Sequence, residues 1–374
     1  MSLDPSTGQR RASWSSPQAL RRRRVRDVVA YLMAALGGVG LLIVLAVIYA
    51  QASDGAAMIW PALLALVPLG IVLVAVRWID RWEPEPVPNL LVAFLWGAGV
   101  ATVISLAVNT TTAVLAASAS VASGDLVASI VSAPLIEEMT KGLGVLIIFL
   151  VWRGSFNGPV DGIVYAAVVA AGFAFAENIL YFVQFRDQLM ATFVMRAVAS
   201  PFAHVTFTAC TGLAIGLASR MRSPVAWVWM TPCGLVGAVA LHAFWNGVLS
   251  AAPSLYLLVE VPFFLACVGL VVWLRWSERM TMRQRLADYA RAGWYEPAEI
   301  TMITTGAGRA TATRWARQRG PAAQAAMKDF LAASASLAAL RQQALDGHAE
   351  ADYASQERQL LERVRGAKEE LGQG

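Results

Sequence analysis

The sequence predicts an all-α membrane protein, a polytopic bundle of about eight transmembrane helices followed by a helical cytosolic tail. The 374 residues are 57% hydrophobic and only 15% charged, with a mean hydropathy of +0.55. A soluble domain carries roughly a quarter charged residues. Several apolar runs also reach the length of about 20 residues that a helix needs to cross a bilayer. A soluble globular protein is therefore excluded.

Eight apolar segments meet this length criterion. They are approximately residues 28–50, 59–78, 89–117, 127–152, 160–183, 193–219, 225–250 and 254–275. The third becomes rich in Thr, Ser and Ala after Asn109, so a bundle of seven helices is the alternative. The first continues too far to be the apolar part of a cleavable signal peptide.

Basic residues predict the orientation and the division of the chain. An arginine cluster at 21–26 precedes the first segment, and the later connections that lie on the same side are also richest in arginine. By the positive-inside rule both termini are cytoplasmic. We divide the chain into a basic N-terminal segment 1–27, a transmembrane domain 28–276 and an amphipathic helical tail 277–374. Arginines beside an apolar run favour contact with lipid headgroups over nucleic acid.

Ionisable residues inside the apolar segments are the strongest functional signal, because burying charge in hydrocarbon is costly. Four segments contain them, and they are Glu137, Glu138 and Lys141 in the fourth, Glu177 in the fifth, His204 in the sixth, and His242 with Asn246 in the seventh. Counted from the outer ends, they lie at similar depths, roughly 9–17 Å at ~1.5 Å per residue. Side chains that share a depth can form one site.

Spacing within each helix supports the same interpretation. Glu137 and Lys141 are four residues apart and Glu138 and Lys141 three, so either carboxylate can pair with the ammonium. His242 and Asn246 also share a helix face. Pro134 loosens the helix just before the acidic pair.

Carboxylates and imidazoles around a cavity in the bilayer suit hydrolysis of an amide bond. Glu137 is the expected general base, and Glu138 is its partner carboxylate, tied to Lys141. Glu177 is a second acid or ligand, and His204, His242 and Asn246 form the oxyanion or ligand set. A metal alternative draws on Glu138, Glu177, His204 and His242, because Glu with two His is a catalytic zinc ligand set. No HExxH motif is present.

Three other interpretations compete with a protease. Single polar residues of this kind are often structural, as ion pairs or hydrogen bonds between helices. A proton-coupled transporter also uses carboxylate and histidine relays, although no internal repeat supports it. A scaffold that binds transmembrane segments without cutting them is the third.

Residues 77–250 resemble the PrsW family of intramembrane proteases, which is related to the CAAX-processing and bacteriocin-processing membrane proteases. The stretches that carry the resemblance, in order, are Asp80–Pro86 with Phe94–Gly97, Ala133–Lys141 with its EExxK element, Asp161–Tyr165 running to Gly172–Tyr181, Arg196 through Ser200–His204 to Gly212, and His242 with Asn246. The arginine-rich N-terminus and the long tail lie outside it.

The resemblance implies cleavage of membrane-anchored regulatory proteins of the anti-sigma-factor kind, in the bacterial plasma membrane. It implies catalytic roles for Glu137, Glu138, Glu177 and His204, and the wider group supports His242 and Asn246. The family is described as metalloproteases, which implies zinc, whereas related enzymes activate water with a glutamate and no metal. The Trp82–Pro86 stretch is expected to be a structural loop on the cytoplasmic side.

Overall fold

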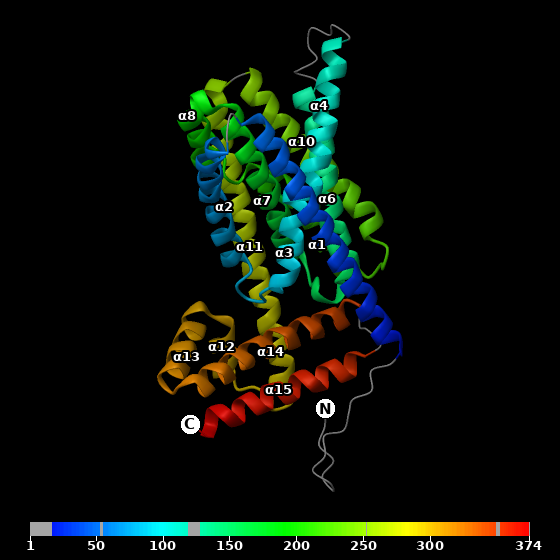
Figure 1. Ribbon diagram of the computed structural model, residues 1–374. Coiled ribbons are helices and arrows are strands. Elements are labelled where there is room, and N and C mark those ends of the chain that lie inside the picture. The colour runs from blue at the N-terminus through cyan, green and yellow to red at the C-terminus, as the bar shows by residue number, and fades with distance from the viewer. Residues whose placement is uncertain (1–16, 53–54, 119–127, 252, 349–351, 374) are drawn as a thin grey trace.

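The computed structural model is built of helices, with no strand, in the residues that it describes, which are all except 1–16, 53–54, 119–127, 252, 349–351 and 374. The α-helices of the bundle are α1 (Pro17–Gln51), α2 (Ile59–Ile79), α3 (Val87–Leu95), α4 (Thr102–Ser118), α6 (Ala133–Val151), α7 (Pro159–Gln184), α8 (Leu189–Phe193), α9 (Ala203–Arg220), α10 (Trp227–Ala251) and α11 (Tyr256–Ala290). The predicted helical membrane bundle is confirmed (Figure 1).

Seven helical stretches among the described residues are long and apolar enough to cross a membrane. The helix α6 is not among them, because its 19 residues include Glu137, Glu138 and Lys141. Adding α6 to these seven stretches gives the eight segments that apolarity and length predict. The long third segment forms one column, in which the π-helical η2 (Trp96–Ala101) joins α3 to α4.

The sixth predicted segment differs from the structure, because it is broken rather than continuous. After α8 the chain forms the π-helical η6 (Val194–Ala199), leaves helical geometry at Ser200 and begins α9 at Ala203. Pro201 lies in this break, and a proline can neither donate to the preceding turn nor fit beside its carbonyl group. The break places His204 in the first turn of α9.

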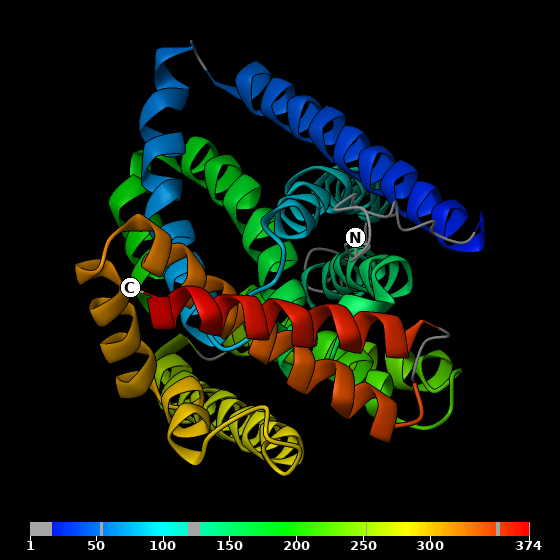
Figure 2. The same cartoon turned by 90° about the horizontal axis from the view of Figure 1, so that it is seen from below.

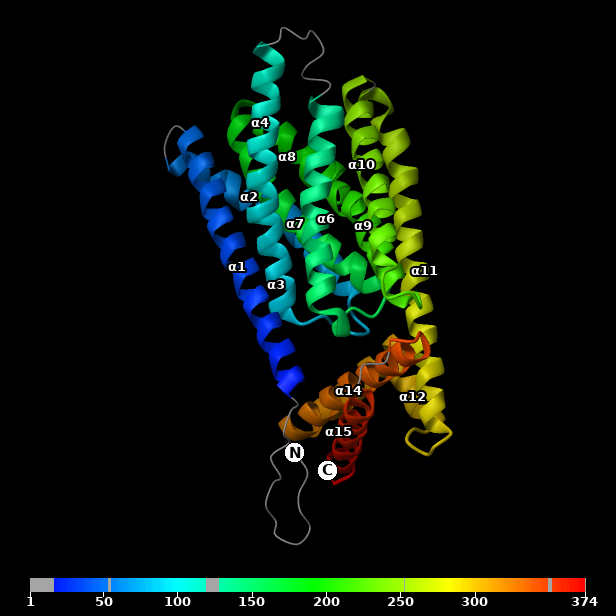
Figure 3. The same ribbon diagram turned by 90° about the vertical axis from the view of Figure 1, so that its right-hand side faces the viewer.

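The helix α7 forms the centre of the bundle. Most of its side chains are buried, and it packs against α9, α2, α3 and η2. At the crossing with α9, a Cβ added to Gly162 would lie 2.0 Å from the carbonyl oxygen of Gly212, so glycine is required for the two backbones to approach. This close contact fixes α9 against α7. In Figure 3, α6 stands between α4 and α10, which both pack against it.

The C-terminal helices form a second core at one end of the bundle, the end from which α1 begins (Figure 1). They are α12 (Pro297–Thr304), α13 (Gly306–Gln318), α14 (Pro321–Leu345) and α15 (Tyr353–Gln373). Helices α14 and α15 lie side by side across that end (Figure 2). Their core includes Leu286 of α11 and Trp82 of the connection between α2 and α3. Because α11 runs unbroken past Trp276, a continuous helix joins the bundle to the tail.

Candidate active site

The first turns of α6 place a buried ammonium group against two carboxylates. The Lys141 side chain has no exposed surface, and its Nζ lies 2.9 Å from Glu138 Oε1 and 3.3 Å from Glu137 Oε2. The sequence spacing allowed either carboxylate to pair with the lysine, and Lys141 contacts both. Two carboxylates in hydrocarbon need such a partner, because an unpaired buried charge is strongly destabilising.

A second ion pair comes from α7 and the broken sixth segment. Glu177 Oε2 bonds to Arg196 Nη2, and the same oxygen lies 2.8 Å from His204 Nε2. Arg196 also donates from Nε to Asn178 Oδ1, and its guanidinium lies 4.2 Å from the centre of the Tyr181 ring. Arg196 therefore fixes the carboxylate that in turn orients His204.

The helix α10 contributes His242, whose Nδ1 lies 3.1 Å from Glu138 Oε1. The other oxygen of Glu138 accepts a 2.8 Å hydrogen bond from Thr208 of α9. The imidazole of His242 stacks on Phe207, with ring centres 4.8 Å apart and planes inclined by 21°. Glu138 is thus held from α6, α9 and α10 at once.

Lys141 joins the two halves of this cluster. Its Nζ lies 3.1 Å from His204 Nδ1 and 3.8 Å from the centre of the Phe173 ring. Polar residues from α6, α7, α9 and α10 therefore meet in one cluster, as their similar depths in the sequence predict. With neutral histidines, three carboxylates face two cations, so a further positive charge or proton would be attracted here.

Hydrogen-bond donors and acceptors assign the proton on each imidazole. An ammonium only donates, so His204 Nδ1 accepts from Lys141 and the ring proton is on Nε2, facing Glu177. For His242, Nδ1 faces the Glu138 carboxylate, so the proton is on Nδ1 and Nε2 keeps its lone pair. Each histidine therefore turns one nitrogen to a carboxylate and the other away from it.

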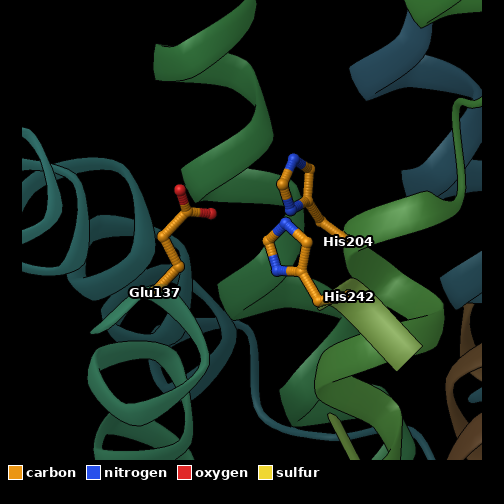
Figure 4. A group of neighbouring side chains, drawn as sticks. All are labelled: Glu137, His204 and His242. Carbon is orange, nitrogen blue, oxygen red and sulfur yellow. The ribbon is translucent and has the colours of Figure 1, made fainter. Parts of the chain in front are cut away.

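Glu137, His204 and His242 form the group that could hold a metal ion among the described residues (Figure 4). Each offers one ligand atom, and these atoms lie within 4.8 Å of one another. A glutamate with two histidines fits a catalytic zinc site. Histidines that bind metals usually hydrogen-bond a carboxylate through their other nitrogen, and here Glu177 and Glu138 do so. The donor set therefore fits a metal, which would take the place of Lys141 Nζ beside His204 Nδ1.

This group differs from the metal set expected from the sequence, which included Glu138 and Glu177 in place of Glu137. Both of those carboxylates face a histidine nitrogen and a cation, so the structure turns them to the histidines, and their role as metal ligands stays a prediction. Which glutamate faces the two imidazoles depends on helix rotation. Helix rotation is not contained in the spacing of residues along the chain.

The amide of Asn246, on α10, contacts the segment that leads into α6. Its Nδ2 donates a 2.8 Å hydrogen bond to the carbonyl oxygen of Ser129, in the π-helical η3 (Ala128–Ser132) that precedes α6. The contact ties α10 to the segment from which Glu137 and Glu138 project. The expected role of Asn246 as an oxyanion donor stays a prediction.

Sequence reasoning did not assign three residues that touch the cluster, namely Arg196, Thr208 and Asn109. Arg196 was visible as an isolated charge just inside an apolar segment, and that is a usable signal. Thr208 lies one turn from His204. The only sequence feature at Asn109 was the change of the third segment to a composition rich in Thr, Ser and Ala, yet Asn109 Nδ2 is 3.5 Å from Glu137 Oε1.

A separate polar cluster lies at the opposite end of α7 and includes the Trp82–Pro86 loop. Both oxygens of Asp80 accept from the backbone N–H of Glu85, at 3.1 and 3.0 Å. Tyr165 donates to Glu85 Oε2, and Asn157 donates to Glu83 Oε1. Burial, with the nearby Asp161, raises the pKa of Asp80 to about 7 and that of Glu85 to about 10.

Comparison with known proteins identifies the family. The sequence profile described as "PrsW family intramembrane metalloprotease" matches residues 85–273, which is half of the chain. The chain belongs to the PrsW family. All the polar side chains of the cluster, from Glu137 to His242, lie within the matched residues, whereas the tail helices α12 to α15 lie beyond them.

Relatives named Protease PrsW agree with the family assignment. The protein from Clostridioides difficile (strain 630) is 36% identical over 154 residues, which cover 40% of this chain and 62% of that one. The protein from Geobacillus kaustophilus (strain HTA426) is 34% identical over 37% of this chain and 58% of that one. The chain thus spans about three fifths of the length of these relatives.

A further relative matches over more of its length. The Bacillus subtilis (strain 168) protein is 29% identical over 192 residues, which cover 51% of this chain and 84% of that one. No solved structure matches this chain.

Proposed function

We propose that this protein is an intramembrane endopeptidase that hydrolyses a peptide bond of a membrane-anchored protein. The observation that carries the proposal is the meeting of Glu137, Glu138, Glu177, His204 and His242, from four helices, inside a bundle that spans a membrane. Charges are retained in hydrocarbon where they do chemistry or transport. Membership of the PrsW family supports catalysis rather than transport.

Glu137 is the proposed general base. One of its oxygens, Oε2, is held by Lys141, which leaves Oε1 to accept a proton from water. The water oxygen attacks the peptide carbonyl carbon, and the proton passes to the leaving nitrogen as the C–N bond breaks. Glu138 keeps Lys141 and His242 in place, and Arg196 with Glu177 keeps His204 in place.

His204, His242 and Asn246 are the proposed groups around the substrate carbonyl. The N–H of each neutral imidazole faces a carboxylate, so a histidine serves as a ligand through its lone pair, or as an oxyanion donor only once that second nitrogen is protonated. Asn246 is the proposed amide donor. If a metal is bound, Glu137, His204 and His242 hold it, and zinc is the proposed ion because this ligand set is typical of catalytic zinc. A bound metal supplies a Lewis acid that lowers the pKa of water. Lys141 already places a cation within hydrogen-bonding distance of Glu137 and His204, which is the basis of the metal-free route.

The metal content of the active protein separates these two routes. Purified protein in detergent is analysed for bound metals, and cleavage is measured before and after chelation and after zinc is restored. The metal route predicts about one zinc per chain and loss of cleavage that zinc reverses. Full activity in a metal-free, chelated preparation assigns the reaction to the glutamate alone.

The proposed substrate is a membrane-anchored regulatory protein of the anti-sigma-factor class, cut in the bacterial plasma membrane. The proposed orientation has both termini in the cytoplasm, since the arginine-rich connections share a side. Residues 28–276 form the proposed protease domain, with its family core at about 77–250. Residues 1–27 and 277–374 are the proposed basic and helical cytoplasmic segments.

The decisive experiment is cleavage of a tagged single-pass protein of this class in proteoliposomes. Glu137→Gln keeps the size of the side chain and removes the base, so we expect cleavage to fall by roughly 10³-fold. Cleavage by the Glu138→Ala variant should fall by a comparable factor. Undiminished cleavage by Glu137→Ala and Glu138→Ala variants that fold normally would contradict the proposal.

A further inference from the structure

Asn109 of α4 projects toward the proposed base from a helix that contributes no other side chain to the cluster. Ser105, Asn109 and Thr112 lie on one face of α4, at successive turns, and each meets α6 or the segment before it. Ser105 lies 3.4 Å from Thr140 Oγ1, and Thr112 lies 3.3 Å from Ser132 Oγ. Only the middle residue of this stripe meets a carboxylate, with Nδ2 at 3.5 Å from Glu137 Oε1.

The other end of the Asn109 amide is buried and lacks a partner. A carboxylate accepts hydrogen bonds, so the amide turns its NH₂ toward Glu137 and its Oδ1 away. Within the described part of the chain, Oδ1 is shielded from solvent and has no hydrogen-bond donor. Buried amide oxygens in native proteins are normally satisfied, often by an ordered water. The orphaned oxygen therefore marks a place for a hydrogen-bond donor beside the base.

We propose that Asn109 holds the attacking water next to Glu137. This inference rests on the proposed peptidase function and adds a residue to it. A water between the two side chains would donate one O–H to Glu137 Oε1 and the other to Asn109 Oδ1. Both of its donors are then used, so the lone pairs on the water oxygen face away from them, toward a substrate carbonyl.

Proton transfer is consistent with this geometry. Glu137 takes the proton that the water directs at Oε1, and the O–H bond to that proton breaks as the bond to the carbonyl carbon forms. The second O–H group of the water stays hydrogen-bonded to Asn109 Oδ1 throughout this step. The Asn109 NH₂ group meanwhile limits the rotation of the Glu137 carboxylate, which Lys141 holds from its other oxygen. Asn109 thus acts on the reacting water and on the orientation of the base.

The test compares kcat and KM of Asn109→Ala with those of Thr112→Val, in proteoliposomes with a tagged membrane-anchored substrate. Thr112 lies on the same face of α4 and contacts Ser132, so the control perturbs the same helix contact without touching Glu137. We expect Asn109→Ala to lower kcat by roughly 10- to 100-fold with KM within twofold, because the contact is to water and base rather than to substrate. Thr112→Val should stay within twofold in both constants.

Three outcomes would overturn the inference. They are wild-type kcat in a folded Asn109→Ala protein, a change confined to KM, and an equal fall in Thr112→Val. Asn109→Leu, which keeps the size of the side chain but has no polar atom, repeats the test if the alanine variant is unstable. Glu137→Gln is run in parallel: its full activity would reject the proposed function itself, whereas its inactivity with an active Asn109→Ala rejects only the role of Asn109.

Discussion

The two polar clusters at the two ends of α7 both bury carboxylates, but they neutralise them differently. Around Glu177, the carboxylates of the membrane cluster face Lys141, Arg196 and two histidines. Around Glu85, the carboxylates accept from neutral groups, which are a backbone N–H, an asparagine amide and a tyrosine hydroxyl. The first cluster pairs its carboxylates with cations. The second satisfies its carboxyl groups with hydrogen bonds and has no ion pair to them within 4.0 Å among the described residues, while Arg220 acts on Glu83 and Asp161 from a longer distance.

This difference indicates different tasks. Ion pairs offset part of the charge on the membrane carboxylates, at the cost of a site that depends on every partner. At the other end, burial raises the pKa of Glu83 well above its usual range and the pKa values of Asp80 and Glu85 as well. With a pKa of about 10, Glu85 is neutral at pH 7, and its hydrogen bond with Tyr165 joins the α2–α3 loop to α7. The comparison separates the proposed active site from a cluster that we interpret as structural.

The tail strengthens the structural interpretation of the second cluster. Arg309 of α13 donates to the carbonyl oxygens of Arg81 and Trp82, and Gln343 of α14 donates to that of Gly154. The guanidinium of Arg309 also lies 4.7 Å from the centre of a Trp82 ring. The loop is therefore fixed from the membrane side by α7 and from the other side by the tail.

The largest expected effect is that of Lys141→Met. It leaves Glu137 and Glu138 buried without their shared cation, so we expect the free energy of unfolding in detergent to fall by about 3–5 kcal/mol, with loss of cleavage. Lys328→Met is the matched control, because Lys328 is exposed on α14, and it should change stability by less than about 0.5 kcal/mol. Equal effects of the two substitutions would contradict the charge balance described for the membrane cluster.

An intermediate effect is expected from Asp80→Asn, which should change how the free energy of unfolding depends on pH. The pKa of Asp80 rises from 3.8 to about 7 on folding, so the folded state binds its proton more tightly. The contribution of Asp80 to stability is complete below about pH 4 and is lost as the pH rises through 7, at up to about 1.4 kcal/mol per pH unit.

Thermal unfolding between pH 5 and 8 measures this slope. Asp80→Asn should flatten the decline in stability with rising pH, whereas Asp187→Asn, at an exposed position in η5 (Arg186–Gln188), should leave it unchanged. Parallel pH profiles for wild type and Asp80→Asn would show that Asp80 is ionised in the folded protein.

The smallest expected effect is that of Glu85→Gln at pH 7. With a pKa of about 10, the Glu85 carboxyl is already neutral, and glutamine keeps an oxygen that can accept from Tyr165. We expect a loss of less than about 1 kcal/mol. Glu138→Gln, the same chemical change beside Lys141, should cost several times more. Equal losses would mean that both clusters depend on charge.

The polar level within the membrane could be predicted from the sequence because helices have a fixed rise per residue. Counting residues along four segments was enough to bring Glu137, Glu177, His204 and His242 to one depth. The pairing partners could not be predicted in the same way. They depend on how each helix is rotated about its axis, and that is set by packing such as the Gly162–Gly212 contact between α7 and α9.

The sixth segment illustrates a local feature with a distant consequence. Pro201 was visible in the sequence, but an apolar window ran across it, and a continuous span 193–219 was predicted. The break at Ser200 redirects the chain, so that Arg196 before it and His204 after it reach the same oxygen of Glu177. Two residues of one segment thus converge on a single atom. In a continuous helix these residues, eight positions apart, would be separated by more than two turns.

The sequence by itself determined that this chain is a helical membrane protein with charged residues at one depth, because hydropathy and helical rise are local properties. The tertiary structure alone decided that Glu138 and Glu177 each support a histidine, while Glu137 turns to the space shared by both imidazoles. It also decided that Asn109 reaches this base from a helix without charge. Contacts between helices follow from rotation and close packing, which only the folded bundle specifies.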